Sequence, residues 1–198
     1  MEHIDNIFQY FTCLPIEIDG LSNVEHFKVR ENGGFLGRYL WKINKNKLYS
    51  IAKEDEANNY ARTYIVRDTR EDQIVAYFSL RAGFVATNNK LFIRSEFDTI
   101  PGVEISNFAI NDIYIKKHPE AKGIGGNIFI RFILPKAKEA QKYIGIHFVY
   151  IFALPYESLI SHYETWGFQR LTKTQEILMH RRIRPRYDKN CIFMYQIL

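Results

Sequence analysis

The sequence predicts a mixed α/β fold in which helices pack on a central sheet. Three observations carry this prediction. Segments rich in β-branched and aromatic residues alternate along the chain with segments of helical apolar spacing. The run from His147 to Leu154 is apolar almost throughout, as in a strand that is covered on both faces. A glycine cluster at Gly123–Gly126 is followed at once by an apolar helical pattern, which predicts a helix that begins at a glycine loop.

Two short helices and a β-hairpin are expected in the first half of the chain. Residues 35–58 have apolar residues at helical spacing, with Asn44–Asn46 as a break between two helices. Residues 61–66 and 73–85 are strand-like and are separated by a polar turn. Residues 86–102 contain turn signals, so we expect Leu91-Phe92-Ile93 to form a short irregular segment.

The second half predicts three further strands and two helices. Val103–Ile115 is expected to be a long central strand with a bulge or kink at Asn111-Asp112. Two helices are expected after it, one over Asn127–Lys142 that Pro135 kinks or ends and one over Glu157–Thr165 that Gly167 stops. A strand that begins at Phe168 and a last strand over Cys191–Ile197 follow. The sequence leaves open whether that last strand pairs within the chain or with a second copy in a homodimer.

Composition and charge narrow the class of protein. The chain has 198 residues, 46% of them hydrophobic, so we expect residues 1–198 to form a single domain. Cys13 and Cys191 lack the paired spacing of a zinc site or a disulfide framework, so we expect two packed thiols and no metal. The formal net charge of +5 favours anionic ligands but does not identify one.

Neither a targeting signal nor a membrane span is predicted. The chain starts Met1-Glu2-His3-Ile4-Asp5, with acids where a signal peptide needs basic residues. No apolar run approaches the roughly 20 residues that cross a bilayer. We therefore expect a cytoplasmic protein that does not bind membranes.

The glycine loop Lys122-Gly123-Ile124-Gly125-Gly126 has the chemistry of an anion site. Amides in such a loop and in the first turn of the next helix have no intrahelical acceptor and point outward together. The cluster alone is also compatible with a turn or a packing device. It lacks the lysine and hydroxyl that follow the glycines of a Walker loop, which disfavours a nucleotide triphosphatase.

Two motifs in register make the loop more specific. Ile115–Gly125 (IKKHPEAKGIG) resembles the GNAT-superfamily pattern of a strand-end aliphatic residue, a short loop and Gln/Arg-x-x-Gly-x-Gly/Ala. Tyr163–Phe168 (YETWGF) resembles the second GNAT signature, and residues 61–66 and 74–80 look like the second and third strands of that family. The resemblance implies an acetyl-CoA-dependent N-acetyltransferase. Its fold would be a mixed central sheet with helices on both faces and a splayed pair of parallel strands that hold CoA.

The resemblance also implies the positions that contact acetyl-CoA, the cosubstrate. Pantetheine would pair with the backbone of a strand end, and the pyrophosphate would lie on the glycine loop. The implied residues are Ile113, Tyr114 and Ile115 at the strand end, and Lys122, Gly123, Ile124, Gly125, Gly126 and Asn127 at the loop. Tyr163 occupies the position of the general acid in this family, and its alternative role is packing against the CoA tail.

No general base is marked as clearly as the acid. Glu104 ranks first because a strand carboxylate can face the cleft and hold a water molecule. The other candidates are Asp112, Glu157 and His162. Two positions depart from the family pattern: Glu120 stands where Gln or Arg is usual, and Tyr156 where Asn is common. The nearby lysines, Lys116, Lys117 and Lys122, would offset the charge of Glu120.

The acceptor is less defined than the donor. We interpret the protein as an N-acetyltransferase that acts on a primary amine of unknown identity. Tyr77–Gly83 (YFSLRAG) resembles the third strand of GNAT toxins that acetylate aminoacyl-tRNA, and the basic segment His180–Arg186 would contact tRNA phosphates. A toxin of this type is therefore the alternative, although residues 1–30 and 172–190 would also suit a small-molecule or peptide pocket. A CoA-binding module without activity is a third interpretation.

Overall fold

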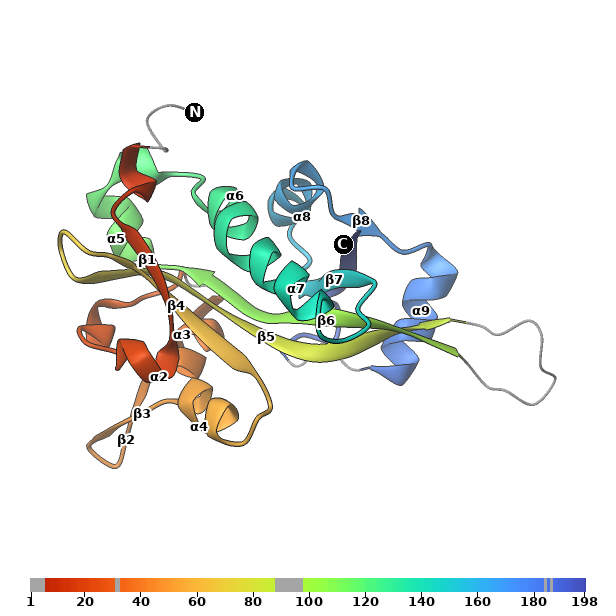
Figure 1. Ribbon diagram of the computed structural model, residues 1–198, viewed down its shortest axis with the longest axis horizontal. Coiled ribbons are helices and arrows are strands. Elements are labelled where there is room, and N and C mark those ends of the chain that lie inside the picture. Colours follow the sequence, from red (N-terminus) through yellow and green to blue (C-terminus); the bar gives the residue numbers. More distant parts are fainter. Residues whose placement is uncertain (1–5, 31–32, 88–97, 184, 186) are drawn as a thin grey trace. The chain divides into compact units, whose positions relative to one another are not determined.

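The chain divides into two compact units. The longest described strands, β5 (Gln73–Thr87) and β6 (Asp98–Ile110), each contribute residues to both units (Figure 1). The computed structural model describes residues 6–30, 33–87, 98–183, 185 and 187–198. Unit 1 consists of Met1–Arg81 and Ser106–Gly125, and unit 2 of Ala82–Ile105 and Gly126–Leu198. The single-domain interpretation of residues 1–198 stays a prediction.

The sheet of unit 1 has the strand order β1-β4-β5-β6. β1 (Phe11–Pro15) pairs antiparallel with β4 (Arg62–Asp68), and β4 pairs antiparallel with β5. The register of β4 shifts between Val66 and Arg67, as at a β-bulge. The hairpin predicted from residues 61–66 and 73–85 is thereby confirmed.

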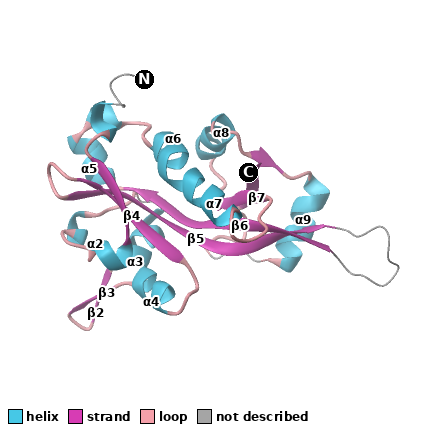
Figure 2. Cartoon of the chain, viewed as in Figure 1, coloured by secondary structure: helices cyan, strands magenta, loops and turns pink. Residues whose placement is uncertain are grey.

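Several short elements pack around this sheet or connect its strands in the described part of unit 1. They are α2 (Ile16–Asp19), the 3₁₀ helix η1 (Val24–His26), α3 (Gly34–Leu40), β2 (Lys42–Asn44), β3 (Lys47–Tyr49), α4 (Ile51–Ala57) and α5 (Asp112–Lys117) (Figure 2). The two helices expected within residues 35–58 are confirmed as α3 and α4. The break between them is a small β-hairpin rather than a simple interruption, because β2 and β3 pair with each other.

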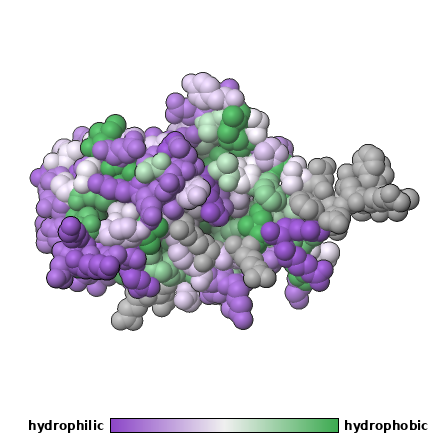
Figure 3. Space-filling model, turned by 90° about the horizontal axis from the view of Figure 1, so that it is seen from below, coloured by the Kyte–Doolittle hydropathy of each residue, from purple (hydrophilic) through white to green (hydrophobic). Residues whose placement is uncertain are grey.

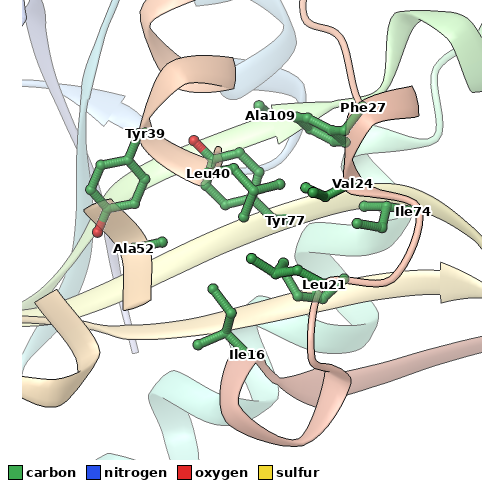
Figure 4. Close-up of a cluster of buried hydrophobic side chains, with 11 residues drawn as sticks. Ile16, Leu21, Val24, Phe27, Tyr39, Leu40, Ala52, Ile74, Tyr77 and Ala109 are labelled. Atoms are coloured by element: carbon green, nitrogen blue, oxygen red, sulfur yellow. The ribbon is translucent and has the colours of Figure 1, made fainter. Parts of the chain in front are cut away.

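A cluster of buried side chains joins the helices of unit 1 to its sheet (Figure 4). Tyr77 from β5 lies at its centre, and its hydroxyl donates a 2.6 Å hydrogen bond to the carbonyl of Leu36. The Tyr39 hydroxyl donates to Asp55 Oδ2 at 2.9 Å, which satisfies a buried carboxylate. The members of the cluster are Ile16, Leu21, Val24, Phe27, Tyr39, Leu40, Ala52, Ile65, Ile74, Tyr77 and Ala109.

The sheet of unit 2 has the strand order β6-β7-β9-β8. β6 runs parallel to β7 (Phe148–Ala153), and β9 (Ile192–Ile197) lies antiparallel between β7 and β8 (Gln169–Arg170). The last strand therefore pairs within the chain. A second buried cluster packs on this sheet and contains Val85, Ala86, Phe148, Tyr150, Met179 and Phe193.

A long helical segment follows the glycine loop, as predicted. It consists of α6 (Gly125–Ile128), the π-helix η4 (Phe129–Ile133) and α7 (Leu134–Gln141). Proline has no N–H to donate, and its ring crowds the carbonyl four residues before it. The predicted disturbance at Pro135 takes the form of this π segment, in which the N–H of Leu134 donates to the carbonyl of Phe129.

Two more helices belong to unit 2. α8 (Glu157–Thr165) has the predicted bounds, and Gly167 follows it with φ +90°. α9 (Lys173–Arg182) covers part of the arginine-rich tail and is capped by a reciprocal pair of hydrogen bonds between Thr172 and Gln175. Hydrophilic side chains cover much of the face in Figure 3, with smaller apolar areas between them.

One strand expected from the sequence has other bounds in the structure, and one expected segment is not described by it. β6 begins at Asp98 and ends at Ile110, so the expected strand Val103–Ile115 is wrong in its last five residues. The expected irregular segment Leu91-Phe92-Ile93 lies outside the described residues.

Cys13 and Cys191 are free thiols. Within the described ranges, no helix is long and apolar enough to cross a membrane, and no three His, Cys, Asp or Glu side chains group as metal ligands would.

Candidate active site

Asn111 ends β6 and begins α5 through a network of buried hydrogen bonds. Its Oδ1 accepts from the amides of Ile113 (3.1 Å) and Lys28 (3.2 Å). Its Nδ2 donates to the carbonyls of Ile74 (2.7 Å) and His26 (3.1 Å). All the capacity of this fully buried side chain is thereby used, and the chain turns from strand to helix at this residue.

This turn corrects the predicted pantetheine strand. The N–H of Ile113 is bonded to the Asn111 side chain and the N–H of Ile115 to the Asn111 carbonyl, at 3.1 Å each. Tyr114 is fully buried, and its hydroxyl donates to Asp68 Oδ2 at 2.9 Å. Residues 113–115 are thus helical, and their geometry excludes extended pairing with a ligand along this segment.

The segment after α5 positions the carboxylate of Glu120. The 3₁₀ helix η3 (Pro119–Ala121) begins directly after His118, whose ring stacks on Tyr114 with 4.4 Å between ring centroids. His118 Nδ1 lies 3.1 Å from Glu120 Oε1, and Nε2 lies 3.2 Å from Glu71 Oε1. A hydrogen bond from its own backbone N–H and the contact with His118 lower the pKa of Glu120. The residue that departs from the family pattern is therefore held by a neighbouring histidine.

The glycine loop leaves several amides without acceptors. The N–H groups of Lys122 and Ile124 donate to the carbonyls of Pro119 and Ala121, at 3.1 Å each. Gly123, between them, has φ +85°, a conformation that favours glycine, and its N–H has no acceptor among the described residues. The first-turn amides at Gly125–Asn127 have no intrahelical acceptor either, because α6 starts at Gly125. These amides suit an anionic group.

Gly126 has a packing role that the sequence did not indicate. A Cβ at this position would lie 2.6 Å from Nε1 of Trp166 and 3.1 Å from two carbons of the same indole. Trp166 belongs to the second sequence motif, so this motif packs directly on the start of the helix in unit 2. Gly123 and Gly126 are thus required for different reasons, the first for backbone conformation and the second for close packing.

The second motif forms the C-terminal cap of α8. The N–H of Phe168 donates to the carbonyl of Tyr163 at 3.1 Å, and the N–H of Gly167 donates to Glu164 at 3.0 Å. These are the two hydrogen bonds of a Schellman motif, in which glycine takes the left-handed position. The usual apolar contact is present as well, because the rings of Tyr163 and Phe168 are 5.6 Å apart. The spacing from tyrosine to Gly-Phe therefore has a structural cause.

An aromatic cluster fixes the ring of Tyr163. The ring meets Trp166 edge to face at 5.0 Å, and Phe129 from η4 contacts both Trp166 (6.0 Å) and Phe168 (5.1 Å). Tyr163 is only 5% exposed, and its hydroxyl has no hydrogen-bond partner among the described residues. Burial and the nearby Cys191 raise the pKa of this phenol well above 10, so it remains a proton donor at neutral pH.

Glu104 is a buried carboxylate on β6 that a tyrosine of the neighbouring strand contacts. The Tyr150 hydroxyl on β7 donates to Glu104 Oε2 at 3.0 Å, and both residues are at most 5% exposed. Gly83 leaves room for this tyrosine, since a Cβ there would lie 2.0 Å from the Tyr150 hydroxyl. The parallel register ends at the rung Glu104–Tyr150, although β7 continues to Ala153.

The other base candidates have simpler surroundings. Asp112 lies 2.7 Å from Lys116 Nζ and 3.0 Å from Arg30 Nε, and these contacts lower its pKa. Glu157 is an exposed acid in the first turn of α8, where the helix dipole favours it. His162 is exposed, with Nδ1 against the carbonyl of Ser158. Tyr156 is 42% exposed and precedes α8 without capping it through its side chain.

Comparisons with known proteins define the fold. No family model matches the sequence, and no curated protein matches it. Among solved structures, the toxin AtaT complexed with acetyl-methionyl-tRNAfMet gives a TM-score of 0.63 at 18% identity, over 92% of this chain and 93% of that one. A tyrosine-to-phenylalanine mutant of KacT gives a TM-score of 0.65 at 17% identity, over 96% of this chain and 95% of that one. AtaTR bound with acetyl-CoA gives 0.64 at 15% identity, over 96% and 94%.

The chain has the GNAT fold. The predicted fold class is thereby confirmed, including the parallel pair that β6 and β7 form. Three residues of the candidate site were not singled out from the sequence: Asn111, Tyr150 and Trp166. Trp166 lies inside a motif that the sequence did reveal, whereas Asn111 and Tyr150 act through partners distant in the sequence.

Proposed function

We propose that this GNAT-fold protein transfers an acetyl group from acetyl-CoA to the amino group of an aminoacyl-tRNA. The observation that carries the proposal is the fold likeness to AtaT, a toxin solved with acetyl-methionyl-tRNAfMet, over 92% of this chain and 93% of that one. Because the likeness spans nearly the whole chain, most of the residues that the sequence left open for another kind of pocket fall within it.

Acetyl-CoA fits the groups that the glycine loop presents. The unpaired amides of Gly123, Gly125, Gly126 and Asn127 would donate hydrogen bonds to the pyrophosphate oxygens, at the positive end of a helical segment. Lys122 adds a positive charge, and His118 holds Glu120 by its carboxylate. The amide of Ile124 is already bonded and its side chain is buried, so this residue would act only through the shape of the loop.

The pantetheine arm requires a strand with unpaired backbone, and residues 113–115 do not supply one. We assign this role to β6 beyond Glu104, since the pairing with β7 ends at that rung. The bound thioester supplies an activated acetyl carbonyl. The residues of the protein must then hold it, exclude water and move two protons.

Tyr163 and Glu104 would perform the proton transfers. A neutral amine attacks the thioester carbonyl, so that a C–N bond forms and the C–S bond breaks. Glu104 would accept the proton that the amine loses, directly or through a water molecule. Tyr163 would donate its phenolic proton or a hydrogen bond to the departing thiolate, since its raised pKa keeps it protonated. The raised pKa of Tyr163 also makes complete proton transfer to the thiolate less favourable. We therefore expect Tyr163 to stabilise the thiolate mainly by a hydrogen bond.

The test supplies labelled acetyl-CoA with a set of acceptors. Charged tRNA, the same tRNA after deacylation, free amino acids, polyamines and protein are compared at equal concentration. We expect label only with charged tRNA, released as an N-acetyl amino acid after mild alkaline hydrolysis. Label in free amines or protein but not in charged tRNA would replace the proposal with the metabolic or protein-modifying reaction. CoA binding without transfer to any acceptor would indicate a binding module.

A further inference from the structure

The β2–β3 hairpin is a basic surface element with no function so far. It runs from Trp41 to Tyr49 (WKINKNKLY) and contains three lysines and no acid. Its base is anchored on both sides, because Trp41 Nε1 donates to the carbonyl of Phe27 at 3.1 Å and the Tyr49 hydroxyl contacts Glu54. Figure 1 shows the hairpin extending away from α3 and α4 within unit 1.

The three lysines of the hairpin lack anionic partners. Within the described residues, Lys42, Lys45 and Lys47 form no ion pair, and the single contact of their charged groups is that of Lys42 Nζ with the Tyr49 ring, 5.0 Å from its centroid. Five other exposed cations of unit 1 are paired, namely Arg30 with Asp112, Arg62 with Glu56, Arg70 with Asp68, Lys116 with Asp112 and Lys117 with Glu71. Lys28, Arg38, Lys53 and Lys122 also form no ion pair among the described residues, but they are dispersed along the chain, whereas the hairpin has three such lysines within six residues. The hairpin is thus a local concentration of unneutralised positive charge.

The geometry of the turn gives a second argument. Lys45 and Asn46 both have left-handed backbones, with φ +49° and +60°, as in a two-residue type I′ turn. Asparagine and glycine are the residues that favour this conformation, and a lysine there costs about 1 kcal/mol. Local folding therefore does not explain a lysine at the tip, whereas a need for charge does.

The two faces of the hairpin differ in character. Cross-strand partners share a face, so Lys42 lies with Tyr49, and Lys47 with Asn44, on one side. Ile43 and Leu48 are partners on the other side and are 63% and 52% exposed. The lysines therefore lie on the face that carries polar partners and at the tip, apart from the two apolar side chains.

We propose that the β2–β3 hairpin binds the phosphate backbone of the RNA substrate through Lys42, Lys45 and Lys47. The proposal rests on the proposed function for the identity of that RNA. A polyanion is the partner that three unpaired lysines on a polar face and a tip best fit. Tyr49 is occupied by Lys42 and Glu54, so it offers no stacking platform, and the contact would be independent of base sequence.

The test measures the salt dependence of RNA binding in the full chain. A hairpin triple variant carries Lys42→Gln, Lys45→Gln and Lys47→Gln. A charge-matched control carries Lys138→Gln, Lys142→Gln and Lys173→Gln, three exposed lysines of unit 2 without ion pairs among the described residues. Each lost phosphate contact lowers the slope of log affinity against log salt by about 0.7 to 0.9. We expect a loss of about 2 to 3 in the hairpin variant and little change in the control.

The affinity for tRNA and the activity on aminoacyl-tRNA should fall in the variant in which the salt dependence of binding falls. We expect the hairpin variant to bind tRNA on the order of 10²-fold more weakly near 0.1 M salt. Its KM for aminoacyl-tRNA should rise, while its rate with a small aminoacyl amide should stay the same. A third variant with arginine at the same three positions should bind as the wild type does, which separates lost charge from lost folding.

Several outcomes would overturn the inference. An unchanged slope in the hairpin variant, or an equal loss in the control, would show that this surface is not the RNA contact. Loss of binding to polyglutamate with unchanged RNA binding would assign the hairpin to an acidic protein partner instead. Hairpin-dependent RNA binding without any acetylation of aminoacyl-tRNA would reject the proposed substrate and leave the RNA contact in place.

Discussion

Glu104 and Tyr150 form the last rung of the parallel pairing between β6 and β7, and a 3.0 Å hydrogen bond joins their side chains. The carboxylate is buried, and the tyrosine that holds it fits only because residue 83 is glycine. The candidate base is therefore fixed at the point where the two strands stop pairing. A substitution of Glu104 removes the carboxylate itself, whereas a substitution of its partner Tyr150 keeps the carboxylate and removes a group that positions it.

Glu104→Gln tests the base directly. The amide keeps the shape and can still accept a hydrogen bond, but it cannot take a proton. We expect kcat/KM to fall on the order of 10 to 10². Tyr150→Phe keeps the carboxylate and removes a hydrogen bond that holds it in place. We expect kcat/KM to fall less in this second variant than in Glu104→Gln, because the group that takes the proton is still present. Wild-type kcat/KM in Glu104→Gln would make the assignment wrong.

Tyr163→Phe should separate chemistry from packing. The phenylalanine ring retains the contacts with Trp166 and Phe168, so thermal stability should change little. Loss of the hydroxyl should lower kcat on the order of 10² with a nearly constant KM for acetyl-CoA. The matched control is Tyr143→Phe, because Tyr143 is 80% exposed and follows α7. If the two variants had equal kcat, Tyr163 would have only a packing role.

Two glycines of the loop should respond differently to alanine. In Gly126→Ala the new Cβ meets the Trp166 indole at 2.6 Å, an overpacking that should cost about 1 to 3 kcal/mol and shift tryptophan fluorescence. In Gly123→Ala there is open space but φ +85°, so the stability loss should be about 1 kcal/mol and the KM for acetyl-CoA should rise. Gly145→Ala, with open space and no such φ, is the control. Equal stability losses at positions 123 and 126 would refute the packing role of Gly126.

The stability of unit 1 should fall in acid. Burial acts to raise the pKa of Asp68, but hydrogen bonds from Arg70 and Tyr114 outweigh it and lower the pKa; Lys117 and His118 lower that of Glu71. A carboxyl with a lower pKa in the folded state stabilises the fold above its unfolded pKa near 4, and this contribution is lost as the pH drops through the folded value. Urea midpoints measured from pH 7 to 3 should therefore decline below about pH 4.

Asp68→Asn should remove much of that decline. Asp68 is fully buried and accepts three hydrogen bonds from Arg70 and one from Tyr114, so the variant should lose on the order of 3 kcal/mol at pH 7. Its stability should then vary less with pH than that of the wild type. Glu164→Gln, at an exposed acid of α8, should leave both quantities unchanged. A pH dependence that survives in Asp68→Asn would assign the acid sensitivity to other carboxylates.

Local signals in the sequence predicted the elements that local hydrogen bonds define. The tyrosine-to-Gly-Phe spacing is a Schellman cap, which is why the bounds of α8 were correct. The glycine loop and the hairpin of β4 and β5 likewise depend on short-range turns. The helix α9 had such a signal in Thr172 and Gln175, a capping box that the interpretation of the tail as a basic segment overlooked.

The errors come from interactions between distant parts of the sequence. Residues 113–115 alternate like a strand, but Asn111 is bonded to Lys28, His26 and Ile74 and turns the chain into α5 before them. The contact of Gly126 with Trp166 and the hydrogen bond from Tyr150 to Glu104 join residues about forty positions apart. The candidate acid could thus be found from a motif, whereas the surroundings of the base required the structure.

The π segment Phe129–Ile133 also bears on how such chains diverge. Its turn contains one residue more than an α-helical turn, and Leu134 bonds five residues back to Phe129. Inserting or deleting a residue within a helix normally rotates everything beyond it by about 100°, which misplaces the buried face. Here a deletion would convert the wide turn into an ordinary one and leave both flanks in phase. Descendants of this sequence could therefore differ by one residue inside regular structure, next to the glycine loop, without a change of fold.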